Sequence, residues 1–165
     1  MRFALTTSLL ITLLTSQASA QTRVFEVPVP ALDSARFELT VATDGEVWLL
    51  GRGATSAVLV RTSGALIRAW VAATDSSFAR RFTAAIGERV TTGAPDLRSL
   101  DGLSRLGWER YTRQSGDTYR MFLSSDVRTS GGPVLSPVTS QQFTEFMRSM
   151  RRALAISDSV VAARR

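Results

Sequence analysis

The segment ARFELTVATDGEVWLLGR, residues 35–52, alternates apolar and polar side chains on both sides of Asp44-Gly45. A period of two is typical of a half-buried β-strand, and Asp-Gly is favoured in the two-residue type I′ turn of a β-hairpin. Such a turn would place Val41 opposite Trp48. We therefore predict a tight hairpin whose core face carries Phe37, Leu39, Val41, Trp48 and Leu50.

A second segment, GWERYTRQSGDTYRMFL at residues 107–123, repeats this pattern with more polar side chains. Aligning Gly45 with Gly116 sets Trp48 against Tyr119 without a gap. With a turn at Ser115-Gly116, the side chains predicted to share the core face are Trp108, Tyr119, Met121 and Leu123. We therefore predict a second hairpin that mirrors the first.

A strand and an amphipathic helix are predicted after each hairpin. In the first helix, which begins at Ser63, the residues at helical spacing are Leu66, Ala69, Trp70 and Ala73. In the second, the apolar stripe consists of Phe143, Phe146, Met147, Met150 and Leu154. Two starts are consistent with the second helix: Ser136-Pro137, or a capping box of Thr139 and Gln142.

These elements predict an α+β fold, in which an antiparallel sheet of two hairpins plus additional strands has two main helices packed on one face. If Ser63 and Ser136 are the helix caps, Trp70 and Phe143 lie equally far into their helices. This agreement favours an internal duplication, with half-units at about 34–90 and 107–157. The tryptophans expected in the core are Trp48, Trp70 and Trp108.

The segments outside the half-units are less regular. We predict a linker at 91–106, in which leucines at every third position, from Leu97 to Leu106, could form one short helical turn. Alternating valines broken by Pro28 and Pro30 indicate an edge strand or extended arm near the N-terminus. The single domain is expected to span 21–157, with a C-terminal tail at 158–165.

The first twenty residues, MRFALTTSLLITLLTSQASA, have the features of a secretory signal peptide. Arg2 supplies the positive charge, a short apolar run follows, and Ala18 and Ala20 form an A-x-A cleavage pattern. The run is shorter than the roughly 20 residues that span a membrane. We expect cleavage after Ala20, no transmembrane segment after cleavage, and a periplasmic or secreted protein.

Composition excludes several kinds of chemistry. All 20 basic residues are arginines, and the chain has no lysine, histidine or cysteine. A serine nucleophile therefore lacks its usual histidine or lysine base, and zinc sites built from cysteine or histidine cannot form. We expect no cofactor and no metal site.

The carboxylates allow one kind of enzyme. Two carboxyl groups across a cleft hydrolyse glycosidic bonds, and the candidates are Asp96, Asp101, Glu109 and Asp117. No flanking motif predicts a raised pKa for any of them, and each is equally consistent with a surface charge, a turn or a helix cap. No D-x-D-x-D-G calcium loop occurs.

The formal net charge of +6 suggests affinity for anionic partners, but the arginines are scattered along the chain. A scattered charge is typical of a solvated surface. No nucleic-acid-binding motif is present, so we expect no nucleic-acid partner. An anionic component of the cell envelope or a protein remains as the expected partner.

The non-core face of the second hairpin carries the candidate ligand-binding residues Tyr111, Arg113 and Arg120. In the predicted register Tyr111 lies opposite Arg120, and Glu109 lies opposite Phe122. An aromatic ring beside a guanidinium group can bind an anionic sugar or peptide. The alternative is a cross-strand pair that only stabilises the sheet.

Three functions are consistent with these observations. The first is an exported, non-catalytic binding or interaction module of the cell envelope. The second is a carboxylate-dependent hydrolase acting on carbohydrate or peptidoglycan, and the third is a basic protein that binds anionic surfaces. The missing catalytic side chains favour the first.

Overall fold

The computed structural model describes residues 24–80, 90–113, 116–127 and 132–165, so the predicted signal peptide at 1–20 lies outside the described residues. The elements in these ranges are β1 (Val24–Val27), β2 (Arg36–Ala42), β3 (Val47–Arg52), β4 (Ala57–Thr62), α1 (Gly64–Ala79), β5 (Val90–Gly93), β6 (Leu97–Arg98), β7 (Ser104–Arg113), β8 (Gly116–Ser125), β9 (Val134–Val138) and α2 (Ser140–Ala162). They form the α+β fold that the sequence predicts.

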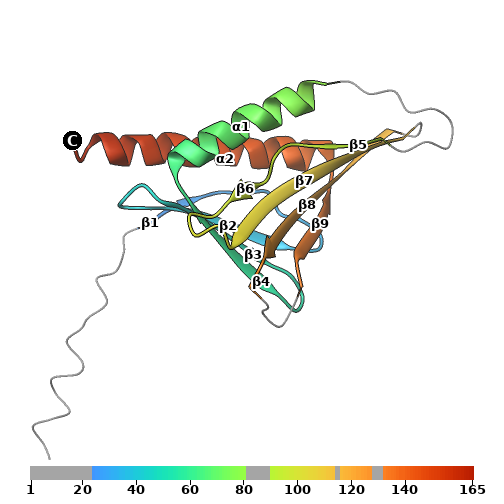
Figure 1. Cartoon of the computed structure of the whole chain (residues 1–165), viewed down its shortest axis with the longest axis horizontal. Helices are drawn as coiled ribbons and strands as arrows, with labels where there is room; N and C mark the ends of the chain where they lie inside the picture. Colours follow the sequence, from blue (N-terminus) through green and yellow to red (C-terminus); the bar gives the residue numbers. More distant parts are fainter. Residues whose placement is uncertain (1–23, 81–89, 114–115, 128–131) are drawn as a thin grey trace, which may run out of the picture.

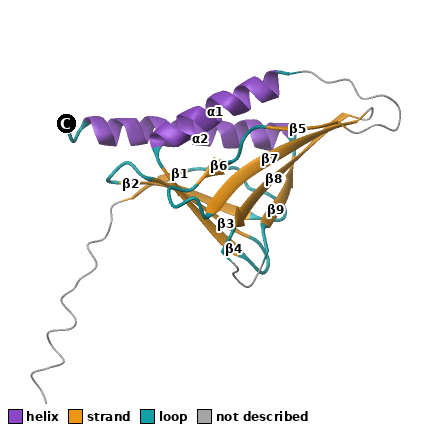
Figure 2. Cartoon of the chain, viewed as in Figure 1, coloured by secondary structure: helices purple, strands orange, loops and turns teal. Residues whose placement is uncertain are grey.

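The strands form two antiparallel sheets. The first sheet has the order β1-β2-β3-β4, and the second has the order β5-β7-β8-β9 with β6 paired to β7. Both helices lie on the same side of the two sheets (Figure 1), where they make one layer above the strands (Figure 2). The core is therefore enclosed by three surfaces, two of sheet and one of helix.

Helix α2 begins at the capping box. Thr139 Oγ1 accepts a hydrogen bond from the Gln142 N–H at 3.1 Å, and Gln142 Oε1 accepts one from the Thr139 N–H at 2.9 Å. The other predicted start is wrong, because Ser136 and Pro137 belong to β9. Pro137 is tolerated there because β9 is an edge strand.

The corrected cap removes one argument for duplication. With Ser63 and Thr139 as the two N-caps, Trp70 and Phe143 no longer lie equally far into their helices. Both halves have the order hairpin, strand and helix. This common order alone does not establish a duplication.

The buried face of α2 contacts both sheets. Phe143, Phe146, Met147 and Met150 are buried as predicted, whereas Leu154 is partly exposed. The Phe143 ring lies 4.8 Å from that of Trp108 in the second sheet, and the Phe146 ring lies 5.9 Å from that of Phe37 in the first, measured between centroids. Neighbouring side chains of one helix therefore join the two sheets.

The buried face of α1 differs from the predicted stripe. Its buried residues are Ile67, Trp70, Val71 and Thr74, and Leu66 is 40% exposed. Thr74 lies inside because its Oγ1 accepts a hydrogen bond from the indole Nε1 of Trp108 at 3.2 Å. A polar residue with a buried partner thus replaces an apolar one in the stripe.

The C-terminal end of α1 is held by an arginine from the second sheet. Arg110 of β7 is only 4% exposed. It donates from Nη1 to the carbonyl of Phe78 at 3.3 Å and from Nη2 to the carbonyl of Arg80 at 2.6 Å. A cation is favourable at this position because the C-terminal carbonyls of a helix carry partial negative charge.

The first hairpin has a longer loop than predicted. Val41 pairs with Val47, the Gly45 N–H donates to the Ala42 carbonyl at 2.9 Å, and the Ala42 N–H donates to the Glu46 carbonyl at 2.8 Å. Gly45 has a φ of +88°. These bonds define a three-residue loop with glycine at its left-handed position, rather than a two-residue type I′ turn.

The extra loop residue reverses the faces of β3. A slip of one residue moves every side chain of a strand to the other face. Val47 and Leu49 are therefore buried beside Leu39 and Val41, while Trp48 and Leu50 lie on the outer face and are only half-buried. The predicted core positions of Trp48 and Leu50 are wrong, whereas those of Trp70 and Trp108 are confirmed.

The core face of the second hairpin is confirmed. Trp108 pairs with Met121 and Leu106 with Leu123, and the four predicted core residues, Trp108, Tyr119, Met121 and Leu123, are buried. Gly116 pairs with Arg113 and is the first residue of β8, so it is not part of the turn predicted at Ser115-Gly116, and residues 114–115 lie outside the described residues. The Tyr119 ring stacks on Phe143 at 5.7 Å between centroids.

The predicted linker contains ordered strands. β5 and β6 both pair with β7, and Leu97 lies opposite Leu106 with both side chains buried. Leu100 and Leu103 are exposed in the turn between β6 and β7. The leucines therefore belong to a hairpin and not to a helical turn.

The two ends of the domain are both ordered. β1 is an edge strand, as the valine pattern predicts. Helix α2 continues to Ala162, and the hydroxyl of Ser157 donates to the Gly45 carbonyl at 2.6 Å. Most of the predicted tail is thus the last part of α2, and it packs on the first hairpin.

The two helices run antiparallel and are linked by two exposed ion pairs, Arg68 with Asp158 and Arg151 with Asp75. Exposed pairs of this kind contribute about 1 kcal/mol or less. The apolar face of α2 therefore dominates the attachment of the helical layer. Within the described residues, no helix is both long and apolar enough to cross a membrane.

Replacing Phe143 by alanine should lower the free energy of unfolding by about 3 to 5 kcal/mol, because a large cavity would form between α2 and the second sheet. Trp48→Ala should cost less than half as much, since Trp48 is half-buried on the outer face. Urea denaturation of both variants measures the difference. Equal losses would contradict the register of the first hairpin.

Candidate binding site on the outer face of the second sheet

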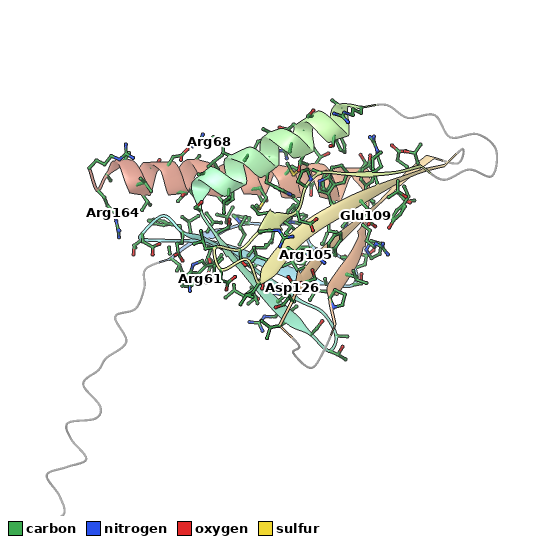
Figure 3. The ribbon with its side chains drawn as sticks, viewed as in Figure 1. Arg61, Arg68, Arg105, Glu109, Asp126 and Arg164 are labelled. Atoms are coloured by element: carbon green, nitrogen blue, oxygen red, sulfur yellow. The ribbon has the colours of Figure 1, made fainter. Side chains whose placement is uncertain are left out.

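The predicted site lies on the face of the second sheet that points away from the helices. Side chains of a strand alternate between faces, so Trp108 and Arg110 point inward whereas Glu109 and Tyr111 point outward. Figure 3 shows Glu109 along β7. Arg120 of β8 lies directly opposite Glu109, and Tyr111 is therefore its diagonal neighbour, opposite Thr118 rather than Arg120.

Glu109, Tyr111 and Arg120 form one cluster, which we call the β7–β8 triad. Arg120 Nη2 lies 2.7 Å from Glu109 Oε2, and it also donates to the Tyr111 hydroxyl. The Tyr111 hydroxyl in turn donates to Glu109. The guanidinium carbon of Arg120 lies 5.3 Å from the centre of the Tyr111 ring, within the range of a cation–π contact.

Arg120 is the accessible member of the triad. Its side chain is 44% exposed, whereas Tyr111 is only 9% exposed. The Tyr111 ring is therefore too covered to act as a stacking platform, and its role is to orient the guanidinium. Within the described residues, Nε and Nη1 of Arg120 have no hydrogen-bond acceptor.

The carboxylate of Glu109 fixes the charge of Arg120. Its hydrogen bond to the guanidinium is the main cause that raises the pKa of Arg120, partial burial opposes the increase, and Tyr111 and the charge of Glu109 add to it. The group therefore stays cationic at any pH at which the protein is folded. It offers an anionic ligand a permanent positive charge and two nitrogens, Nε and Nη1, that have no acceptor among the described residues.

The sequence also predicts Arg113 and Phe122 on this face. Arg113 ends β7 opposite Gly116, and its side chain lies outside what the structure describes. Phe122 lies opposite Gly107 instead of Glu109. A Cβ atom at Gly107 would lie 2.2 Å from the Phe122 ring, so the ring covers the glycine closely.

A second cluster of a glutamate, an aromatic residue and an arginine lies on the outer face of the first sheet, with tryptophan in place of tyrosine. In this β3–β4 triad, Arg61 Nη2 lies 2.7 Å from Glu46 Oε2, and Trp48 Nε1 donates to the same oxygen at 3.1 Å. The guanidinium carbon of Arg61 lies 5.5 Å from the centre of the Trp48 ring. Sequence reasoning missed this triad because the one-residue error in the hairpin placed Trp48 in the core.

The two triads differ in the donors that remain available. Arg61 uses both Nε and Nη2 for Glu46, whereas Arg120 uses only Nη2 for its triad. The Glu46 hydrogen bond is also the main cause that raises the pKa of Arg61. The two triads thus allow a comparison of two similar arginines, of which Arg120 has more donors without an acceptor in the part of the chain that the structure describes.

The carboxylates considered for hydrolysis are each engaged locally. Asp96 lies 3.4 Å from Arg105 Nη1, and Asp101 accepts from the Ser99 hydroxyl and from the Leu103 N–H. These two bonds, the Ser99 hydroxyl first, lower the pKa of Asp101. A general acid needs the opposite shift.

Two other kinds of site are a metal-binding cluster and a hollow in the surface. In the described part of the chain, no three carboxylates gather at a place that could hold a metal ion. A hollow of about 660 Å³ lies where β1 separates from β2, lined by residues 26–32 and 35–40. It includes none of the residues of either triad.

The fold and the site define an α+β protein of two antiparallel sheets, with a glutamate–aromatic–arginine triad on the outer face of each. No protein-family model matches the sequence, and no curated protein sequence matches it.

Arg120→Ala should lower the free energy of unfolding by less than about 1 kcal/mol, because the ion pair is exposed. Tyr111→Phe should cost about 1 kcal/mol by removing the hydroxyl while keeping the ring. Tyr111→Ala should cost more, since the ring is covered. Chemical denaturation checks all three, and unfolding of the Arg120→Ala variant would show that Arg120 belongs to the interior.

Asp101 should make stability depend on pH in acid. Its folded pKa is lower than its ordinary value of 3.8, so its contribution is present above pH 3.8 and is lost as the pH falls through the folded pKa. Asp101→Asn should therefore be less stable than the parent protein at pH 7, and the difference should shrink toward pH 2. A difference that is constant across pH would contradict the hydrogen bonds of Asp101.

Proposed function

We propose that this protein is an exported, non-catalytic binding module, and that Arg120 is the residue that contacts an anionic ligand. One observation carries the proposal: Arg120 is held by Glu109 and Tyr111, is 44% exposed, and keeps Nε and Nη1 without an acceptor among the described residues. Nε and Nη1 lie on different edges of the guanidinium, so each can donate one charge-assisted hydrogen bond to an anionic group.

The composition of the chain supports a binding role. With no histidine, lysine or cysteine, the common nucleophile and base pairs are missing. The pKa of Asp101 is lowered, so this carboxyl group is poorly suited to donate a proton, and Asp96 forms an ion pair with Arg105. These features favour binding over hydrolysis.

The cell envelope is the proposed location, because residues 1–20 have the pattern of a signal peptide. Carboxylated sugars and peptides occur there, and they match the chemistry of Arg120. The ligand class that we propose is therefore an oligomer that carries carboxylates.

The proposal is tested by the affinity of the mature protein for oligogalacturonate, a carboxylated sugar oligomer, with maltopentaose as the neutral comparison. Arg120→Ala should weaken binding about tenfold or more, because a charged hydrogen-bonding group is lost. Arg120→Lys should recover little, since an ammonium group cannot bind Glu109 and Tyr111 through one nitrogen while two further nitrogens donate to the ligand. Calorimetry or fluorescence titration gives these affinities.

Arg61→Ala is the matched control, because Arg61 occupies the corresponding triad of the first sheet. It should change the affinity less than twofold, well under the tenfold loss expected for Arg120. Equal losses in both variants would favour a basic protein that binds any anionic surface. Equal binding of the neutral oligomer would contradict the role of Arg120 altogether.

A further inference from the structure

Strand β1 leaves one edge of the first sheet open. No strand in the described part of the chain pairs with its outer edge, and Val24 and Phe25 are 41% and 47% exposed. Natural proteins usually protect such an edge with charged side chains (lysine above all), proline, a bulge or a very short strand. The four residues of β1, VFEV, include no lysine or proline, and Glu26 is the one charged residue among them.

The direction of the backbone groups on this edge follows from the first hairpin. The Ala42 N–H donates to the carbonyl of Glu46, which directly precedes β3, so by alternation Val41 and Leu39 direct their N–H and C=O groups toward β1. Their partners there are Phe25 and Val27. The polar backbone groups of Val24 and Glu26 therefore point away from the sheet.

An apolar groove runs beside the open edge. It has a volume of about 430 Å³ and lies between Phe25 and α2, where its lining consists of Arg152, Ala155, Ile156, Ser159, Val160 and Ala163. Phe25 lies on this side because it is opposite the buried Val41. Figure 1 shows the C-terminal half of α2 passing over β1.

We propose that this edge binds β1 of a second copy of the chain, forming a symmetric dimer in which the first sheets join. In an antiparallel pair of identical strands, Val24 and Glu26 must occupy the hydrogen-bonded positions. One register meets this condition with Phe25 opposite Phe25 of the second copy and Val24 opposite Glu26 of the second copy. It forms about four backbone hydrogen bonds.

Charge and proline exclude the next register along the strand. It would place Glu26 directly opposite Glu26 of the second copy, which is destabilising. It would also place Val24 opposite Pro28, which has no N–H to donate. The first register avoids both, and it sets two phenylalanines side by side over the groove, an arrangement that aromatic cross-strand pairs favour.

The absence of cysteine from the chain allows a direct test by disulfide trapping. In the Phe25→Cys variant, the substituted residues of the two copies would face each other with their Cα atoms about 4.5 Å apart. This distance is within the range that a disulfide bridges. In Val24→Cys they would be two residues out of register, more than about 7 Å apart. Mild oxidation should give a covalent dimer for the first variant and not for the second.

Light scattering after gel filtration tests the same interface without a cross-link. The parent protein should have twice the mass of one chain and should dissociate on dilution. Glu26→Pro removes an N–H that is used only between copies, so it should be a monomer with unchanged circular dichroism. Glu26→Gln keeps that N–H and should remain a dimer.

Three outcomes would overturn the proposal: a parent protein that is monomeric at every concentration, a Glu26→Pro variant that is still dimeric, or equal cross-linking at positions 24 and 25. If Glu26→Pro fails to fold, the trapping experiment decides alone.

Discussion

The fold depends on two phenylalanines of α2 that contact different sheets. Phe143 packs on Trp108 and Tyr119 of the second sheet, and Phe146 packs on Phe37 of the first. The two sheets have separate hydrogen-bonded ladders, and one backbone hydrogen bond, from the Leu100 N–H to the Arg61 carbonyl at 2.8 Å, links β4 to the β6–β7 turn. Side-chain packing must therefore supply most of the contacts that set their relative position. An apolar helix face that contacts both sheets provides that constraint at a low cost in conformational entropy, because the residues of one rigid helix make contacts to both sheets at once.

The structure shows which kinds of local pattern can be read from sequence. The buried stripe of α2 and its capping box depend on residues three and four positions apart, and both were predictable. The existence of the two hairpins was equally local. The division into two sheets was not predictable, because it depends on which strand edges meet, and short strands such as β6 are hidden in a segment rich in glycine.

The two hairpins also show why register is harder to predict than strand position. In the first, one additional loop residue exchanged the faces of β3, so Trp48 was assigned to the core and its triad was missed. In the second, Tyr111 and Arg120 were each paired two residues away from their true partners. A shift of two preserves the face, and the residues of the β7–β8 triad were therefore placed together on the correct side.

The contacts between the halves of the chain have a consequence for how the protein can be divided. Arg110 from the second half satisfies the last carbonyls of α1 in the first half, and Ser157 from α2 satisfies the carbonyl of Gly45. Removal of the second half would leave these carbonyls of the first half without donors, and removal of the first half would leave Nη1 and Nη2 of the buried Arg110 without these acceptors. A gene fragment that encodes either half alone should therefore yield an insoluble or protease-sensitive product.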